Sequence, residues 1–195
     1  MRVLVACEYS GTVREAFKAA GHDAWSCDFL ETEIPGNHYQ GDVRDMLTQD
    51  WDLMVAHPPC TYLASSGLHW NTRRPERAKL TEEALGFVRL LLGAEVPRIA
   101  LENPIGCIST RIRKPDQIIQ PWQFGHDASK ATCLWLVGLP PLRETEVLPG
   151  GRGALRGNQT PSGQNKLGPS PDRWKERSRT YPGIAAAMAA QWLKE

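Results

Sequence analysis

Residues 52–60 read DLMVAHPPC, an apolar run of strand length that stops at two consecutive prolines. Proline fixes its own φ and lacks an N–H donor, so Pro58 and Pro59 end the strand and restrict the backbone beside them. The next side chain, Cys60, is therefore held at the rim of a sheet. A small buried thiol is the usual state of a free cysteine, but this setting favours a functional one.

Short apolar runs and helical patterns alternate around this stretch. We expect further strands at 2–7, 23–28, 98–101 and 131–137, a short extended segment ending near 41–42, and helices at about 12–20, 75–95 and 184–193. Thr12 is the expected N-cap of the first helix. Strands that alternate with helices predict a parallel α/β sheet, with ligands beyond the carboxyl ends of its strands. The side chains that follow those ends carry chemistry: Glu8, Asp28, Asp42, Cys60 and Glu102.

Length and composition narrow the class of protein. With 195 residues, 41% of them hydrophobic and 23% charged, we expect a single globular domain spanning 1–195. Residues 149–173 are dense in Gly, Pro, Ser, Asn and Gln, which predicts a mobile loop within that domain. The net charge of +1 leaves DNA contacts to a local patch or a short substrate.

The cysteines and the apolar runs indicate the compartment. The 5 cysteines include no CxxC pair, which argues against a disulfide framework or a structural zinc site and suits a reducing cytoplasm. No run approaches the ~18 apolar residues of a membrane span, and the first residues read as a strand rather than a signal peptide. We therefore expect a cytoplasmic protein.

Glu102 precedes Asn103 and Pro104 at the end of an expected strand, and should point into the same crevice as Cys60. A thiolate that adds to carbon 6 of cytosine breaks the aromaticity of the ring and makes carbon 5 nucleophilic. A carboxyl group hydrogen-bonded to ring nitrogen 3 stabilises the charge that develops there. A capping or solvated glutamate is the alternative; with Cys60, the pair predicts methyl transfer to carbon 5.

The first strand, turn and helix fit the binding of a nucleoside-type cofactor. Gly11 would let the backbone approach a ligand, although one glycine is a weaker signal than a full GxGxxG. Asp28 ends the second strand, where an acid commonly meets ribose hydroxyls, and Asp42 would suit an adenine amino group. Solvated loop charges are the alternative for both acids.

The order of these features resembles the motif series of DNA cytosine-5 methyltransferases, above all Pro58-Pro59-Cys60 followed by Glu102-Asn103. The resemblance covers roughly residues 1–105 and is to short phage-type members that lack a target-recognition domain. It implies a Rossmann-like fold of the S-adenosylmethionine-dependent methyltransferases in a single domain. It also implies a covalent Cys60 adduct supported by Glu102.

The same resemblance implies a donor and a substrate. The donor would be S-adenosylmethionine or a modified analogue, and Arg111 or Arg113 would contact the substrate base. The residues expected to bind the donor are Cys7, Glu8, Tyr9, Ser10, Gly11, Asp28, Phe29, Asp42, Val43, His57 and Pro58. Since no segment is large enough for a target-recognition domain, we expect DNA that is single-stranded or read with little sequence preference. The basic runs 73–79 and 173–179 could bind the phosphate backbone or a single strand of DNA. Alternatively, they are solvated helix ends.

The sequence is also compatible with two other functions. The same chemistry on a free cytidine nucleotide fits the near-neutral charge, and a non-catalytic module that binds cofactor or nucleic acid fits the missing recognition domain. Such a module would need neither Cys60 nor Glu102. Zinc deaminases require H-x-E with P-C-x-x-C, which the sequence around His57 lacks, so no metal is expected. Amino-group methyltransferases place Asp or Asn before Pro-Pro, where this chain has His57.

Overall fold

A single seven-stranded sheet forms the centre of the computed structural model, which describes residues 1–192. Its strands are β1 (Arg2–Ala6), β2 (Asp23–Asp28), β3 (His38–Gln40), β4 (Leu53–Ala56), β5 (Ile99–Pro104), β6 (Gln117–Ile119) and β7 (Thr132–Val137). The spatial order is β3-β2-β1-β4-β5-β7-β6. The first five strands in this order pair in parallel, whereas β7 runs antiparallel to both β5 and β6.

This is a Rossmann-like α/β fold with a single sheet, as predicted. The expectation of a wholly parallel sheet is wrong for β7. Its connection from β6 contains only one short 3-10 helix, η2 (Pro121–Gln123), instead of a crossover helix. Strands joined without a crossover pair antiparallel, so β7 begins at the edge where β4 and β5 end.

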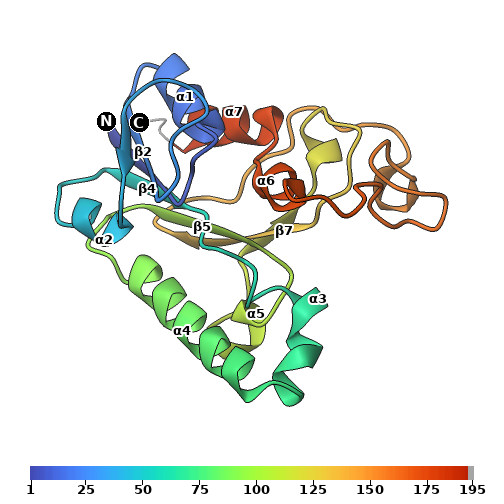
Figure 1. The fold of residues 1–195 in the computed structure, drawn as a ribbon. Helices are drawn as coiled ribbons and strands as arrows, with labels where there is room; N and C mark the ends of the chain where they lie inside the picture. Colours follow the sequence, from blue (N-terminus) through green and yellow to red (C-terminus); the bar gives the residue numbers. More distant parts are fainter. Residues whose placement is uncertain (193–195) are drawn as a thin grey trace.

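Helices cover both faces of the sheet (Figure 1). The α-helices are α1 (Thr12–Ala19), α2 (Val43–Met46), α3 (Ser65–Leu68), α4 (Pro75–Leu92), α5 (Ile108–Arg111), α6 (Arg173–Ser178) and α7 (Pro182–Gln191). Two more 3-10 helices are η1 (His69–Thr72) and η3 (Gly151–Gly153). In Figure 1, α1 and α7 lie against one face and α4 lies against the other. The three predicted helices correspond to α1, α4 and α7; the helices of four to six residues were not predicted.

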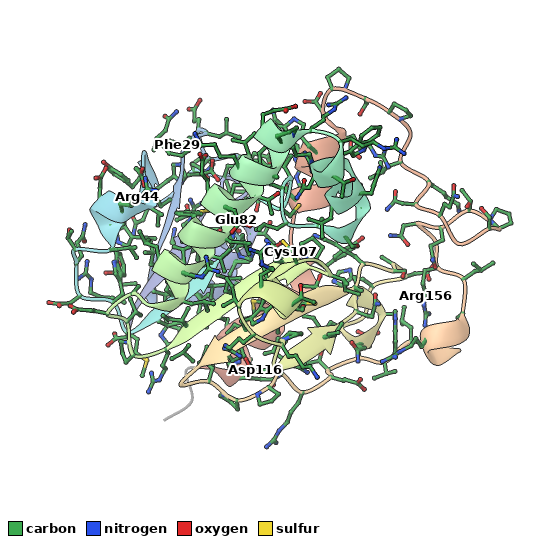
Figure 2. All side chains as sticks on the ribbon, turned by 90° about the horizontal axis from the view of Figure 1, so that it is seen from below. Phe29, Arg44, Glu82, Cys107, Asp116 and Arg156 are labelled. Carbon is green, nitrogen blue, oxygen red and sulfur yellow. The ribbon has the colours of Figure 1, made fainter. Side chains whose placement is uncertain are left out.

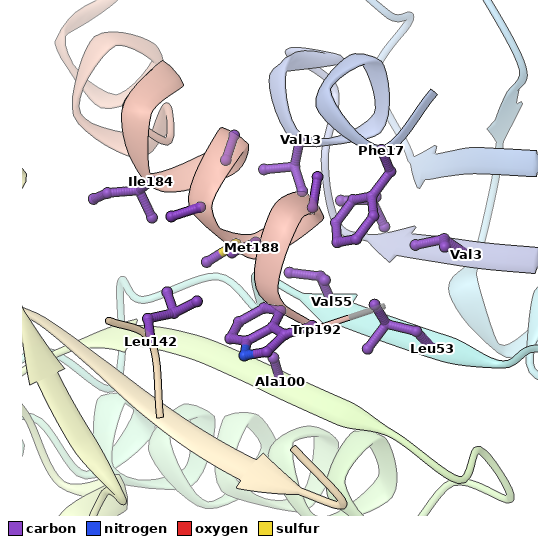
Figure 3. Close-up of a cluster of buried hydrophobic side chains, with 14 of the residues drawn as sticks. Val3, Val13, Phe17, Leu53, Val55, Ala100, Leu142, Ile184, Met188 and Trp192 are labelled. Atoms are coloured by element: carbon purple, nitrogen blue, oxygen red, sulfur yellow. The ribbon is translucent and has the colours of Figure 1, made fainter. Parts of the chain in front are cut away.

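The alternation of side chains along β1 divides the core in two. Val3 and Val5 face the cluster beneath α1 and α7, where Phe17 and Met188 are fully buried (Figure 3). Leu4 and Ala6 face the opposite cluster, which α4 covers. Burial on both faces explains why the central strands read as continuous apolar runs.

Residues 149–173 form irregular structure with one 3-10 turn, and specific bonds tie part of them to the body. Asn158 accepts a hydrogen bond from the Ser129 amide at 2.9 Å and donates one to the Ser129 carbonyl at 3.0 Å. The predicted mobility of this segment stays a prediction. Among residues 1–192, no helix has the length and apolar character needed to cross a membrane.

Candidate active site

The carboxyl ends of β1, β2, β4 and β5 lie in register. Ala6 aligns with Cys27 on one side and with Ala56 on the other, and Ala56 aligns with Leu101. The residues that follow these positions therefore share one edge of the sheet. The loop that carries Pro58, Pro59 and Cys60 therefore lies at the same edge of the sheet as Asp28 and Glu102.

The loop that carries Cys60 is bonded to the end of β5. The Asn103 side-chain amide donates to the Pro58 carbonyl at 2.8 Å, and the Cys107 amide donates to the Leu63 carbonyl at 2.9 Å. The Cys60 carbonyl in turn accepts from the amides of Leu63 and Ala64 at 3.0 and 2.9 Å. The loop is therefore a fixed turn rather than a free connection.

Cys60 differs from the other four cysteines because it is exposed, whereas Cys27, Cys107 and Cys133 are buried and Cys7 is half-buried. Desolvation of the thiol, followed by the charge of Glu102, raises the pKa of Cys60 above its ordinary value. The charges of Lys130 and Arg177 act in the opposite direction. The two cations thus partly offset the effects of desolvation and of Glu102, both of which disfavour the thiolate.

Glu102 is buried and pairs with His57. The His57 Nδ1 atom lies 3.0 Å from Glu102 Oε2, and both side chains are about nine-tenths buried. Burial raises the pKa of Glu102, but the hydrogen bond from His57, the charge of Lys130 and a bond from Thr132 outweigh it and lower that pKa overall. Sequence reasoning had expected His57 beside the donor rather than against this carboxylate.

A cavity of about 270 Å³ lies beside this edge, between the ends of β2 and β3 and helix α4. Its lining residues are Cys7, Cys27, Asp28, Phe29, Gly41, Asp42, Val43, Arg44, Pro59 and Phe87. Five of the residues predicted to bind the donor are among them: Cys7, Asp28, Phe29, Asp42 and Val43. The other five, Cys27, Gly41, Arg44, Pro59 and Phe87, were not among the predicted residues. The sequence around Arg44 and Phe87 carries no signal that would have found them.

The two acids of the cavity are held in different ways. Asp28 accepts a hydrogen bond from the Leu30 amide at 3.0 Å, and burial raises its pKa above the ordinary value. Asp42 is the N-cap of α2; its two oxygens accept from the backbone amide and the guanidinium of Arg44 at 2.9 and 2.8 Å. The carboxylates are thus oriented by the backbone of the turns that contain them.

The turn after β1 makes its hydrogen bonds within the protein, at the start of α1. The Glu8 carboxylate accepts from the amides of Val13 and Arg14 at 2.7 and 3.2 Å and from the Ser10 hydroxyl at 3.0 Å. The Glu8 side chain therefore caps α1. Gly11 occupies the N-cap position, and Thr12, the expected N-cap, is the first residue of the helix. Glu8, Ser10 and Gly11 were predicted to bind the donor, but none of them lines the cavity.

Tyr9 and Gly11 make their close contacts within the protein. The Tyr9 hydroxyl donates to the Lys175 carbonyl at 2.9 Å. Gly11 has φ +74°, and a Cβ there would lie 2.8 Å from the Arg14 guanidinium. The glycine is thus required by backbone conformation and by the packing of Arg14.

Neither Arg111 nor Arg113 bonds to Cys60 or Glu102 in the described part of the chain. Arg111 pairs with Glu82 on α4 at 2.7 Å, and Arg113 pairs with Asp116 at 2.6 Å. Figure 2 shows Asp116 on the opposite side of the molecule from Phe29 and Arg44. Lys130 lies near Glu102, because antiparallel β7 starts beside the end of β5. The Lys130 ammonium donates to the Arg179 carbonyl at 3.0 Å.

Two aromatic and basic clusters lie near the same edge. In the first, Arg73 and Arg74 lie over the Trp70 ring, with 5.7 and 5.1 Å to its centroid. In the second, the Trp174 ring lies 6.0 Å from the ring of Tyr9, and Lys175 lies 5.7 Å from the centroid of the Trp174 ring. Trp70 is 39% exposed and Trp174 is 53% exposed. Both rings therefore remain accessible to a ligand.

The described part of the chain contains no group of three or more His, Cys, Asp and Glu side chains placed to hold a metal ion. No known protein family and no curated protein matches this sequence. Among solved structures, the chain is similar to a prophage-encoded candidate DNA modification methyltransferase (E. coli), with 14% sequence identity and a TM-score of 0.49. The match covers 76% of this chain, and the chain spans about half (52%) of the length of that protein.

Proposed function

We propose that this protein transfers a methyl group from S-adenosylmethionine to carbon 5 of cytosine in DNA through a covalent adduct with Cys60. One observation carries the proposal. An exposed cysteine that follows β4 and a buried glutamate near the end of the adjacent parallel strand β5 lie at the same edge as a cavity lined by two carboxylates. This combination supplies a nucleophile, an acid for the base and a place for the donor.

The cavity fits the nucleoside part of the donor. Asp28 has one oxygen bonded to the backbone and a second oxygen that can accept from ribose hydroxyls. Phe29 and Phe87 offer apolar surface to a purine ring, and Asp42 would accept from its amino group. S-adenosylmethionine supplies an electrophilic methyl group carried on a positively charged sulfur.

The protein residues then act on the base. The step needs Glu102 in its acid form, even though its neighbours lower the pKa of this residue. The Cys60 thiolate then bonds to carbon 6 while Glu102 delivers its proton to ring nitrogen 3, so that carbon 5 becomes nucleophilic. After methylation, water takes the proton from carbon 5, and the freed electron pair forms the double bond between carbons 5 and 6 as the Cys60 thiolate departs. Nitrogen 3 then returns its proton to Glu102. Lys130 lies close enough to influence the charges of both residues.

The two aromatic and basic clusters favour single-stranded DNA as the substrate. Each of the runs 73–79 and 173–179 holds four basic residues and one acidic residue, although the whole chain carries only +1. Positive charge is thus concentrated beside the site. Figure 1 places α3, which leads into Trp70, and α6, which carries Trp174, on opposite sides of the sheet. Exposed rings among cations stack unpaired bases and bind the backbone without reading sequence.

Nucleoside mass spectrometry tests the proposal. The protein and S-adenosylmethionine are incubated with single-stranded DNA, duplex DNA or dCMP, beside the variants Cys60→Ala and Cys133→Ala. We expect 5-methylcytosine in the single strand, its loss in Cys60→Ala and its retention in Cys133→Ala. Unchanged product with Cys60→Ala would reject the adduct, and turnover of dCMP alone would reject DNA as the substrate. A product with a different added mass would indicate a modified donor.

A free cytidine nucleotide is the second candidate substrate. The overall charge of +1 favours it, because polynucleotide binders commonly carry a larger basic excess. Replacing Trp174 with Ala distinguishes the two substrates. The substitution should weaken binding of an oligonucleotide and leave the KM for dCMP unchanged, because a mononucleotide at Cys60 has no second base to stack.

A further inference from the structure

His57 and Glu102 are held together by two neighbouring bonds between the exit of β4 and the end of β5. His57 Nδ1 contacts Glu102 Oε2 at 3.0 Å, and the adjacent Asn103 donates to the carbonyl of Pro58 at 2.8 Å. The His57 backbone amide also donates to the Ala6 carbonyl of β1 at 2.9 Å. His57 is therefore bonded to two strands, to β1 through its backbone amide and to β5 through its imidazole.

The opposite ring nitrogen of His57 is unusual. Nε2 is buried and has no hydrogen-bond partner among the described residues. A buried polar atom without a partner has lost its hydrogen bonds to water and gained none in return, which costs free energy. Such atoms commonly mark functional sites. A polar group of a bound ligand would remove this penalty.

Other groups face Glu102 from β7 and from the cysteine loop. Lys130 and Thr132 favour its carboxylate form, whereas the thiols of Cys60 and Cys133 lie close enough for Glu102 to raise their pKa values. Among these neighbours, His57 is the one whose ring makes a direct bond of 3.0 Å to a carboxylate oxygen. That bond engages Oε2, and Thr132 also hydrogen-bonds the carboxylate. Oε1 is the oxygen that His57 does not engage.

We propose that His57 is a positioning residue for Glu102: its Nδ1–H holds Oε2 so that Oε1 faces nitrogen 3 of the base, and the two side chains act as one unit. The inference rests on the proposed function for the identity of the base. In the step, Glu102 in its acid form gives its proton to nitrogen 3 while the Cys60 thiolate bonds to carbon 6. The carboxylate that remains is stabilised by the His57 donor, and it takes the proton back when the adduct breaks down.

Two substitutions separate this role from simple packing. Asn carries its amide nitrogen on the same atom to which His attaches Nδ1, so His57→Asn retains a donor toward Oε2. His57→Leu fills similar space without a donor. We expect His57→Leu to form the covalent adduct with a 5-fluorocytosine oligonucleotide about 100-fold more slowly, the scale of a misplaced catalytic group. His57→Asn should stay within a few-fold of the wild type.

A second readout requires no catalysis. In protein labelled with ¹³C at glutamate carboxyl carbons, the Glu102 titration should move to higher pH in His57→Leu, because burial is then less well opposed, and should return toward the wild-type value in His57→Asn. An unchanged titration in His57→Leu, equal adduct rates in all three proteins, or an Asn variant as slow as the Leu variant would each overturn the proposal. If the wild type forms no adduct, the proposed function fails, while the titration still decides whether His57 controls Glu102. Should His57→Leu not fold, His57→Gln serves in its place, since its amide cannot sit at the Nδ1 position.

Discussion

Substituting Glu8 tests whether this carboxylate belongs to the fold or to the donor site. Its oxygens accept from two backbone amides at the start of α1 and from the Ser10 hydroxyl, in a buried environment. Hydrogen bonds to a charged group contribute about 1.5–3 kcal/mol, and loss of a helix cap costs about 0.5–2 kcal/mol. These contributions overlap, so Glu8→Ala should lower the free energy of unfolding by roughly 2–4 kcal/mol.

Thermal unfolding followed by circular dichroism measures this effect. In a domain of about 200 residues, each kcal/mol shifts Tm by about 2–4 °C, so we expect a fall of roughly 4–16 °C. Glu31→Ala is the matched control, because Glu31 is exposed and should change Tm by less than about 2 °C. Donor affinity measured well below Tm should be unchanged in Glu8→Ala. A Tm equal to that of the control, or a large loss of donor affinity in a stably folded variant, would refute the capping role.

Three further predictions concern the site and the core. Because the pKa of Cys60 is raised, its alkylation by iodoacetamide should still accelerate as the pH rises through 9, and Lys130→Ala should move the profile to higher pH; a plateau below pH 8 would contradict this. Asp28→Ala should weaken donor binding about 10- to 100-fold by calorimetry, the scale of a lost charged hydrogen bond, whereas Asp23→Ala at the other end of β2 should leave it unchanged. Phe17→Ala, beneath α7, should reduce unfolding free energy by about 3–5 kcal/mol in urea titrations, and a loss under 1 kcal/mol would contradict its place in the core.

The sequence predicted the elements whose burial is reflected in local patterns. Strands β1, β2, β4 and β7 are apolar runs bounded by turns, and the buried side chains of α4 recur at helical spacing, so these elements were found within a few residues. Elements of three or four residues, such as β6 and α5, are too short to show a period. Their existence depends on tertiary pairing, such as the antiparallel bonds of β6 to β7.

The candidate site was predictable to the extent that strand ends meet at one edge. Glu102 and Asp28 lie at the ends of expected strands, and Cys60 follows one within a few residues, so their convergence could be inferred from a parallel sheet. Phe87 reaches the cavity from the middle of α4, and Lys130 reaches Glu102 because β7 is reversed. Neither position has a local signature, since each depends on contacts between segments far apart in sequence.

The capping of α1 by Glu8 also limits which cofactors the fold can accept. The first amides of a helix that follows a strand are a common binding place for phosphate groups. Here the amides of Val13 and Arg14 are occupied by an internal anion. A dinucleotide or a phosphorylated nucleoside placed there would find its hydrogen-bond donors taken and would meet a negative charge. The protein would therefore discriminate against phosphorylated adenosine compounds through a residue that does not line the donor cavity.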